Sequence, residues 1–205
     1  MSPDHVRGWT SRGYLPHFDG GAVAQFITYR LYGTVPTSLI EQWKEAAAAN
    51  PSGPRNLVAR NIEAYADANC GSALLSDPAL ARIVECGLLQ YDAVRYHLHA
   101  WVVMPNHIHA LITPMPEVSL STIIRAWKVA SARSINAVLE RSGSIWAPDY
   151  FDRFIRDERH MASTIAYIDR NPVKAGLCCV PEEWPFGSCA RLHAEQSYPR
   201  DTPVP

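Results

Sequence analysis

The sequence predicts an α+β fold in a single domain, and three observations lead to this prediction. Strand-like segments occur near the N-terminal end and again around a tight turn in the middle of the chain, and amphipathic helical stretches surround them. The chain has 205 residues, enough for one domain with a hydrophobic core, and its 47% hydrophobic content is ordinary for a globular protein. The pattern alone leaves the topology of the sheet open.

The first part of the chain predicts one strand and three helices. Residues Ala22–Tyr32 are rich in β-branched and aromatic side chains, which favours a strand. The helical stretches that follow lie near 37–49, 55–69 and 78–90. The breakers in Asn50–Pro54 separate the first two, and Asp77 and Pro78 open the third in the order of a cap followed by proline. The first twenty residues are polar and glycine-containing, which predicts an arm or an irregular lead-in.

The middle of the chain predicts a β-hairpin followed by a long helix. Val94–Met104 indicates one strand, Pro105-Asn106 the turn, and His107–Thr113 the return strand. Ser119 is expected to cap the helix, whose apolar residues recur at largely helical spacing. These apolar residues are Leu120, Ile123, Ile124, Trp127, Ile135 and Val138.

The C-terminal part predicts one more helix, over about 157–170. Asn171-Pro172 is expected to end this helix, because proline disfavours helical geometry at the residue before it. The segment 144–156, which precedes the helix, is aromatic and basic. The tail after Arg191 carries three prolines, and we expect it to be frayed.

Composition argues against several classes of protein. The net charge of −1 is unlike that of a protein that coats nucleic acid non-specifically, although it leaves room for a local basic groove. The five cysteines are odd in number and form no C-x-x-C pair, which argues against a disulfide framework or a zinc knuckle. The apolar runs are far shorter than the ~20 residues of a membrane helix, and the N-terminus lacks the apolar run of a signal peptide. We therefore expect a cytoplasmic protein without a membrane partner.

His107 and His109 are the first candidates for chemistry. They alternate on a predicted strand directly after a tight turn, so their side chains point to one face with Cα atoms roughly 6–7 Å apart. Two imidazoles placed in this way can converge on one metal ion, while Ile108 faces apolar packing on the other side. Two hydrogen-bonded histidines without a metal are the commoner explanation of such a pair when it is taken alone.

His97 and His99 form a second pair on the preceding strand. With a two-residue turn, His109 lies opposite Val102, and the same register places His97 and His99 on the other face of the sheet. We therefore expect no site built from all four histidines. A register slip of one residue would undo this inference.

Tyr167 and Asn171 are the second candidates, four residues apart on the last predicted helix, so that one lies above the other. The apolar stripe of this helix consists of Met161, Ile165 and Ile168. Tyr167 lies roughly 120–130° around the helix from the centre of that stripe, among polar neighbours, which suits chemistry better than packing. A structural tyrosine remains an alternative on geometry alone, and Asn171 before a proline is also typical of a helix cap.

Four stretches of the chain also occur in an order that is known from one family. They are YLPHFDGGAVAQFITYRL, YHLHAWVVMPNHIHALITP, WAPDYFDRFIRDERH and YIDRNPVKAGL. These stretches resemble the REP-associated tyrosine transposases, which belong with the HUH single-strand DNA transposases and endonucleases. The resemblance implies a ferredoxin-like α+β sandwich with a central antiparallel sheet, the HUH endonuclease fold. It covers roughly 13–190, the expected core of one domain at 1–205, with an N-terminal arm at 1–12 and a flexible tail at 191–205.

The resemblance implies a metal-dependent single-stranded DNA endonuclease and strand transferase, that is, a tyrosine transposase. Such an enzyme forms a 5′-phosphotyrosine intermediate and acts on hairpin or REP-like DNA in transposition. Carried onto this sequence, Tyr167 is the catalytic nucleophile, and His107, His109 and Asn171 hold a divalent metal, Mg²⁺ or Mn²⁺. The ligand preference of imidazole alone favours zinc-like ions instead. We expect single-stranded or hairpin DNA as the partner and favour a monomer.

The candidates for contacts with the DNA backbone come from residues 121–174, in which nine Lys and Arg exceed six Asp and Glu by three. They are Arg125, Lys128, Arg153 and Arg156. The near-neutral net charge of the whole chain is lower than we expect of a DNA enzyme, which bears on affinity rather than on chemistry.

Three other functions fit parts of the pattern. A zinc hydrolase of the H-x-H-x-D-H type requires an aspartate and a histidine where Leu111 and Ile112 stand. The H-x-E signature of the deaminases also fails, because Ile108 is followed by His109. A catalytically inactive module that binds hairpin DNA is the alternative that keeps the resemblance. An α+β domain with incidental histidines is the alternative without it.

Overall fold

A four-stranded antiparallel sheet in the order β4-β5-β3-β6 organises the fold. The structure is a computed structural model, and it describes residues 8–12, 15–50, 52, 57–68 and 70–197. The strands of the sheet are β3 (Gln25–Arg30), β4 (Tyr96–Val103), β5 (His107–Pro114) and β6 (Phe151–Phe154). The helices are α1 (Thr37–Ala49), α2 (Leu57–Asp67), α3 (Pro78–Leu89), α4 (Leu120–Val138), α5 (Glu158–Lys174) and α6 (Ser188–Ser197).

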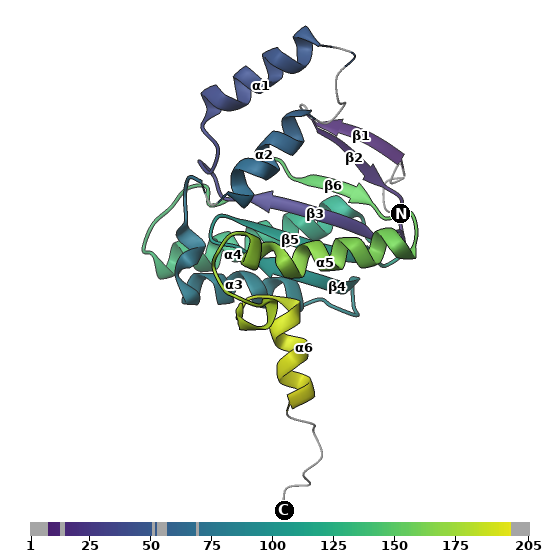
Figure 1. Cartoon of the computed structure of the whole chain (residues 1–205), viewed down its shortest axis with the longest axis vertical. Helices are drawn as coiled ribbons and strands as arrows, with labels where there is room; N and C mark the ends of the chain where they lie inside the picture. Colours follow the sequence, from purple (N-terminus) through teal and green to yellow (C-terminus); the bar gives the residue numbers. More distant parts are fainter. Residues whose placement is uncertain (1–7, 13–14, 51, 53–56, 69, 198–205) are drawn as a thin grey trace, which may run out of the picture.

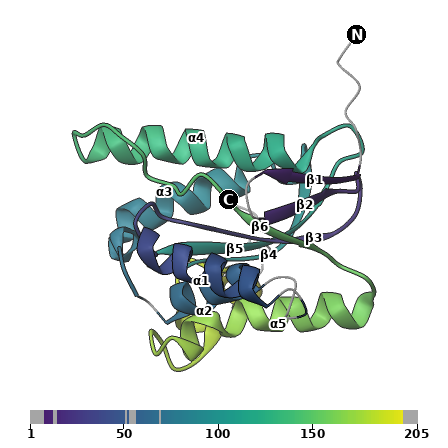
Figure 2. The same cartoon turned by 90° about the horizontal axis from the view of Figure 1, so that it is seen from above.

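The order of these elements confirms the predicted ferredoxin-like sandwich. From β3 the chain passes through α1, α2 and α3 to β4, turns into β5, crosses by α4 and returns in β6. Figures 1 and 2 show the sheet between two helical layers, with α4 on one side and α5 on the other. No helix among the described residues combines the length and the apolarity that crossing a membrane requires.

Each face of the sheet packs its own hydrophobic core. The larger core joins one face to α3 and α4, and it includes Ile108, fully buried on the face away from the histidine pair as predicted. The smaller core lies under α5 and contains Phe26, Leu111 and Ile168. The predicted stripe of α4 is buried from Leu120 to Ile135, whereas Val138 is 58% exposed.

The β4–β5 hairpin has the predicted register near its turn, where Val102 pairs with His109. Farther along β4, a β-bulge shifts the register between Leu98 and Ala100. Side chains alternate between the two faces of a sheet along a strand. The extra residue therefore exchanges the faces on which the side chains lie in the part of β4 that precedes the bulge.

The bulge changes the face on which the second histidine pair lies. His97 pairs with Thr113, which shares a face with His107, and Nε2 of His99 lies 2.8 Å from Oγ1 of Thr113. The predicted placement of His97 and His99 on the opposite face is therefore wrong. The two pairs nevertheless lie apart, because Thr113 is six positions along β5 from His107 and four from His109, roughly 20 and 13 Å at the rise of a strand.

The two ends of the chain are more regular than expected. β1 (Gly8–Arg12) and β2 (Leu15–Asp19) form an antiparallel hairpin in place of an irregular lead-in. Helix α6 occupies the first part of the expected tail, and residues 198–205 lie outside the described residues. In the aromatic and basic segment 144–156, β6 is a strand that the sequence pattern did not predict.

Helix α5 continues past the point at which it was expected to end. It includes Pro172 and runs to Lys174, because the missing amide and the steric clash of a proline affect only its last turn. The amide of Ala175 then donates to the carbonyl of Asn171 at 3.0 Å. Asn171 is therefore an internal helical residue, and both the predicted end of the helix and the alternative role of Asn171 as its cap are wrong.

A buried chain of hydrogen bonds joins β4 to both helices of the larger core and yields a stability prediction. Trp127 Nε1 donates to the hydroxyl of Tyr96 at 2.8 Å, and this hydroxyl donates to the carbonyl of Leu88 at 2.6 Å. Tyr96→Phe should lower the free energy of unfolding by about 1–3 kcal/mol, because it leaves a buried indole N–H without an acceptor. Urea denaturation measures the loss. The control Tyr32→Phe, at a side chain that is 65% exposed, should change stability by less than about 0.5 kcal/mol, and an equal loss in both variants would contradict the argument.

Candidate active site

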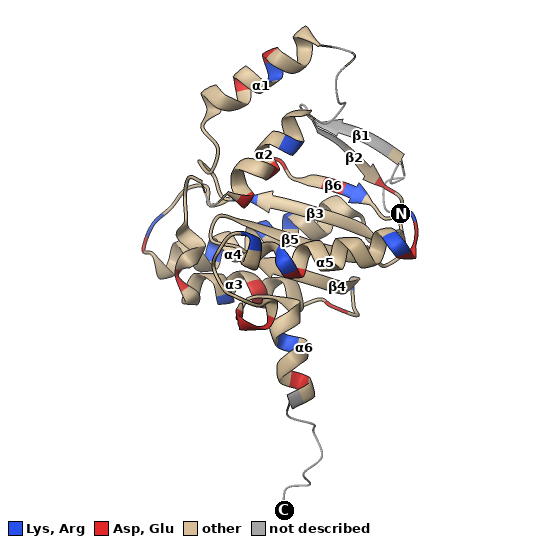
Figure 3. Cartoon of the chain, in the orientation of Figure 1, with Lys and Arg blue, Asp and Glu red and all other residues tan. Residues whose placement is uncertain are grey.

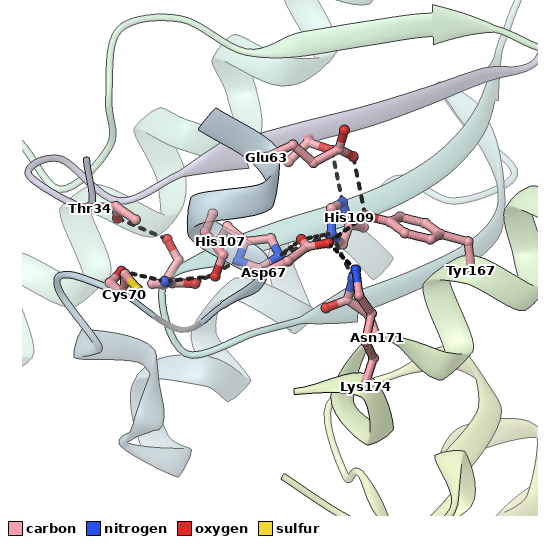
Figure 4. Close-up of polar contacts among 12 residues, drawn as sticks. Thr34, Glu63, Asp67, Cys70, His107, His109, Tyr167, Asn171 and Lys174 are labelled. Atoms are coloured by element: carbon pink, nitrogen blue, oxygen red, sulfur yellow. Dashed lines mark hydrogen bonds and ion pairs between the residues drawn. The ribbon is translucent and has the colours of Figure 1, made fainter. Parts of the chain in front are cut away.

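Two buried imidazoles at the start of β5 form the centre of the candidate site. His107 and His109 are both 0% exposed, and their Nε2 atoms face each other at 3.0 Å. Figure 4 shows them between the C-terminal end of α2 and the inner face of α5. The tight turn and the alternation of the strand bring the two rings together, as the sequence pattern predicts.

Asn106 determines which nitrogen of His107 carries the proton. Its amide Nδ2 donates to the carbonyls of Ala66 at 3.1 Å and Cys70 at 2.9 Å, and both of these groups can only accept. The amide oxygen of Asn106 therefore faces Nδ1 of His107, at 2.6 Å, and must receive its proton. Nε2 of His107 is left with a free lone pair.

The same reasoning applies to His109. The Nδ2 group of Asn171 lies 3.2 Å from Nε2 of His109 and can only donate to it, so Nε2 is an acceptor. Nδ1 of His109 then donates to Oγ1 of Thr28 at 2.8 Å. Burial, followed by the charge of His107, lowers the pKa of His109 to about 4, so the ring is neutral at neutral pH.

Asp67, the last residue of α2, completes this group. Its Oδ1 atom lies 3.4 Å from Nε2 of both His107 and His109. Its Oδ2 atom accepts from the hydroxyl of Tyr167 at 2.8 Å and pairs with Nζ of Lys174 at 3.1 Å. The carboxylate thus joins the imidazole pair of the sheet to the polar face of α5.

The three residues on that face of α5 point into the site together. Tyr167, Asn171 and Lys174 follow at spacings of four and three residues, which places them on one side of the helix. The ring of Tyr167 contacts the rings of Phe26 and His109, with centroids 5.8 and 5.3 Å apart. Its position is half-buried and among polar partners, in keeping with its predicted place off the apolar stripe.

The hydroxyl of Tyr167 lies between two carboxylates of α2. It is 2.8 Å from Oδ2 of Asp67 and 3.3 Å from Oε1 of Glu63, one turn earlier on that helix. Burial, then the charges of Glu63 and Asp67, raise the pKa of Tyr167 well above its usual value. The phenol is therefore protonated at neutral pH.

The donor set fits a divalent metal ion. Asp67, His107 and His109 offer ligand atoms that lie within 4.8 Å of one another, the one such group of His, Cys, Asp or Glu among the described residues. The lone pairs of both imidazoles meet Oδ1 of Asp67, which has no hydrogen-bond partner within the part of the chain that the structure describes. Oδ1 of Asn171 is also buried without a partner among the described residues, and if a cation replaced the hydrogen bond from Nδ2 to His109, a half-turn of the planar amide would direct this oxygen at the site. Converging acceptors without a proton between them are stabilised by a cation.

The predicted DNA contacts separate into two groups. Arg153 is exposed on β6, with its guanidinium 5.7 Å from the centroid of Phe26 on the face of the site, and Arg156 is exposed just after that strand. Arg125 and Lys128 belong to α4 in the opposite layer (Figure 2). Lys128 moreover donates to the carbonyls of residues 147, 148 and 149, at 2.9–3.2 Å, which does not favour a role in binding DNA.

Asp67, Glu63 and Lys174 are the site residues that the sequence analysis missed. A usable signal was present in α2, where Ala59 and Ala66 mark the buried side of the helix. Glu63 and Asp67 lie on that same side at spacings of four and eight residues from Ala59. Carboxylates on the buried side of an amphipathic helix indicate a charged partner in the interior.

A family model described as "Transposase IS200 like" matches residues 76–171 of this chain. The matched range includes the histidine pair, Tyr167 and Asn171, and it leaves out α2 with its two carboxylates.

Relatives and a solved structure agree with the family model. The chain is 31% identical over 106 residues to the REP-associated tyrosine transposase of Escherichia coli (strain K12), over 52% of this chain and 62% of that protein. A relative from Haemophilus influenzae is also 31% identical, over 110 residues, and is again covered to 62%. The chain thus matches less than two thirds of the length of these curated relatives. A solved structure of a REP-associated tyrosine transposase bound to a REP hairpin has the same fold, with a TM-score of 0.59, 20% identity, and coverage of 96% of this chain and 92% of that chain. The resemblance inferred from the sequence is confirmed: over about half of its length this chain is similar to REP-associated tyrosine transposases, and it shares the fold of the solved one.

Proposed function

We propose that this protein is a DNA transposase that cuts and rejoins single-stranded DNA, with Tyr167 as its nucleophile and a divalent metal at His107 and His109. The observation that carries the proposal is the contact between a tyrosine hydroxyl and a buried donor set for a metal, built from three separate segments of the chain. The names of the relatives support the transposase role, and the REP hairpin bound by the structural neighbour supports hairpin or REP-like DNA as the substrate.

The chemistry follows from the position of the tyrosine. The oxygen of Tyr167 attacks the scissile phosphate, the bond from phosphorus to the 3′ oxygen breaks, and a 5′-phosphotyrosine and a free 3′-hydroxyl remain. A phenol, with an ordinary pKa near ~10, is a good leaving group from phosphate, so a DNA 3′-hydroxyl can attack the adduct later. Rejoining then needs no external energy source, a property that suits strand transfer.

His107, His109, Asp67 and Asn171 are the residues that would hold the metal. A bound divalent cation would neutralise charge on the scissile phosphate and orient it for in-line attack. The two neutral imidazoles favour zinc-like ions, whereas the carboxylate and amide oxygens suit magnesium or manganese. We propose Mg²⁺ or Mn²⁺, because a site of mixed nitrogen and oxygen donors accepts either ion and the resemblance points to them.

We also propose that DNA approaches the site from the side of β6 and α5. Figure 3 shows basic positions on β6 and along α5, the elements that border the tyrosine. Arg153 is exposed there, and the side chain of Lys174 is 64% exposed although its ammonium reaches the site. An unpaired strand can bring its phosphate to a half-buried hydroxyl that the bulk of a duplex would obstruct, so we expect single-stranded or hairpin DNA to be preferred.

Tyr167→Phe should abolish the covalent adduct and leave binding of hairpin DNA unchanged, since the change removes only the nucleophilic oxygen. The measurement is a denaturing gel after incubation with labelled single-stranded hairpin DNA and Mn²⁺. Tyr150→Phe is the matched control, because Tyr150 stacks on His17 with ring centroids 4.2 Å apart, and it should retain the adduct. An adduct that survives in Tyr167→Phe would place the nucleophile elsewhere. A wild-type protein that binds the hairpin without forming an adduct would instead identify a DNA-binding module without catalysis.

His109→Ala should weaken Mn²⁺ binding at least 10-fold, and Asn171→Ala should weaken it by a smaller factor, since each change removes a candidate ligand from the buried set. Isothermal calorimetry on the protein without DNA measures both dissociation constants. His99→Ala is the control at an exposed histidine on the neighbouring strand, and it should bind as the wild type does. Equal weakening in His99→Ala and His109→Ala would contradict the proposed ligand set.

Arg153→Gln should weaken binding of single-stranded hairpin DNA. It should also make the negative slope of the logarithm of the association constant against log salt shallower by about 1, because one phosphate contact is lost. Arg125→Gln, at an exposed position in the opposite helical layer, is the matched control and should leave both the affinity and the slope unchanged. Fluorescence anisotropy at several salt concentrations gives both quantities. A larger effect of Arg125→Gln would place the DNA on the α4 side.

A further inference from the structure

The hydroxyl of Tyr167 has two carboxylates within reach, and they differ in what else they contact. Besides the tyrosine, Asp67 faces both imidazoles through Oδ1 and Lys174 through Oδ2, so its other polar partners among the described residues belong to the metal site or its rim. Glu63 lies one turn earlier on α2 and approaches the tyrosine from outside that donor set, at 3.3 Å. Among the described residues, Glu63 is not part of the group that could hold a metal.

This difference separates the tasks of the two carboxylates. A carboxylate that binds a divalent cation shares its lone pairs with the cation and becomes a poor acceptor for a proton. Asp67 is therefore unsuited to take the proton of Tyr167 once the site is loaded. The phenol still has to lose a proton when its oxygen bonds to phosphorus, and Glu63 is the carboxylate that remains in contact with it.

We propose that Glu63 is a catalytic residue that accepts the proton of Tyr167 during cleavage and returns it during rejoining. The inference rests on the proposed function. In cleavage, the Tyr167 oxygen bonds to phosphorus, its proton passes to Oε1 of Glu63, and the 3′ oxygen leaves and takes a proton from water. In rejoining, a 3′-hydroxyl attacks phosphorus and loses its proton to water, and Glu63 gives its proton to the departing phenolate oxygen. By microscopic reversibility, one group performs both transfers.

The surroundings of Glu63 suit a group that holds a proton between two steps. Burial and the charge of Asp67 on its own helix raise the pKa of the Glu63 carboxyl. Arg153 from β6, together with Tyr167 and Lys174 from α5, act in the opposite direction and keep the carboxylate form accessible. A base whose pKa is moved toward neutrality both accepts and releases a proton more readily than an ordinary glutamate.

Helix α2 holds Glu63 in place by contacts outside the reacting groups. Ala66 and Cys70, at and just beyond the end of the helix, accept hydrogen bonds from the buried amide of Asn106. The small side chains of Ala59 and Ala66 are buried on the side of the helix that carries Glu63. The position of the helical turn that carries Glu63 therefore does not depend on the contact of its carboxylate with Tyr167.

The test compares Glu63→Gln with the control Glu41→Gln, at an exposed glutamate of α1. The first variant keeps the size and hydrogen-bonding capacity of the side chain and removes its ability to accept a proton. With saturating Mn²⁺ and labelled hairpin DNA, the single-turnover rate of adduct formation should fall by roughly 10²–10⁴-fold in Glu63→Gln and remain unchanged in Glu41→Gln. The melting temperature, the affinity for Mn²⁺ and the affinity for hairpin DNA should match those of the wild type.

A second comparison separates proton transfer from positioning. Replacing Tyr167 with a fluorinated, more acidic tyrosine should reduce the loss caused by Glu63→Gln, because a more acidic phenol depends less on a base. An unchanged adduct rate in Glu63→Gln, or a loss that the fluorinated tyrosine does not reduce, would overturn the proposal. A loss matched by weaker Mn²⁺ binding would overturn it as well, since it would make Glu63 a metal ligand. In each of these cases an adduct in the wild type would leave the proposed function standing, whereas its absence there would refute that function first.

Discussion

The candidate site depends on the three hydrogen bonds of one buried amide, that of Asn106. Both of its amide hydrogens go to backbone carbonyls at the end of α2, so its oxygen is left to fix the tautomer of His107. One side chain thereby links the hairpin turn, the tautomer of an imidazole and the end of a helix that lies 40 residues earlier in the chain. The carboxylates of α2 meet the histidines of β5 because these hydrogen bonds of the Asn106 amide hold the two elements together.

The two faces of the sheet have different roles. On the side of α3 and α4, the contacts are packing and buried hydrogen bonds, and Lys128 is used there to hold the loop before β6. On the side of α2 and α5, the smaller core supports polar groups that converge on the histidine pair. A rigid core on one face can thus stabilise a face on which buried charges are gathered at a cost in desolvation.

Features that depend on spacing within one element could be predicted from the sequence. The turn followed by His107 and His109 and the four-residue interval from Tyr167 to Asn171 follow from the periods of a strand and a helix. The acidic groups could not be found in this way, because the hydroxyl of Tyr167 meets Asp67 across 100 positions of the chain and only tertiary packing joins them. Pro172 was expected to end α5, but its missing amide and its steric clash affect only the last turn, so the helix continues to Lys174. Similarly, the net charge of a segment carries no information about the layer in which its arginines lie.

The β-bulge between Leu98 and Ala100 has a consequence for comparing this chain with its relatives. The extra residue inverts the alternation of inward and outward positions toward the N-terminal end of β4, while the end next to the turn keeps its register. A homologue without the bulge would therefore be one residue shorter there, and aligning it without a gap would match core positions with exposed ones from Tyr96 to Leu98. Substitution patterns in this stretch can be interpreted physically only when the gap is placed at the bulge. Without that gap, the second histidine pair, His97 and His99, aligns with residues of the opposite face.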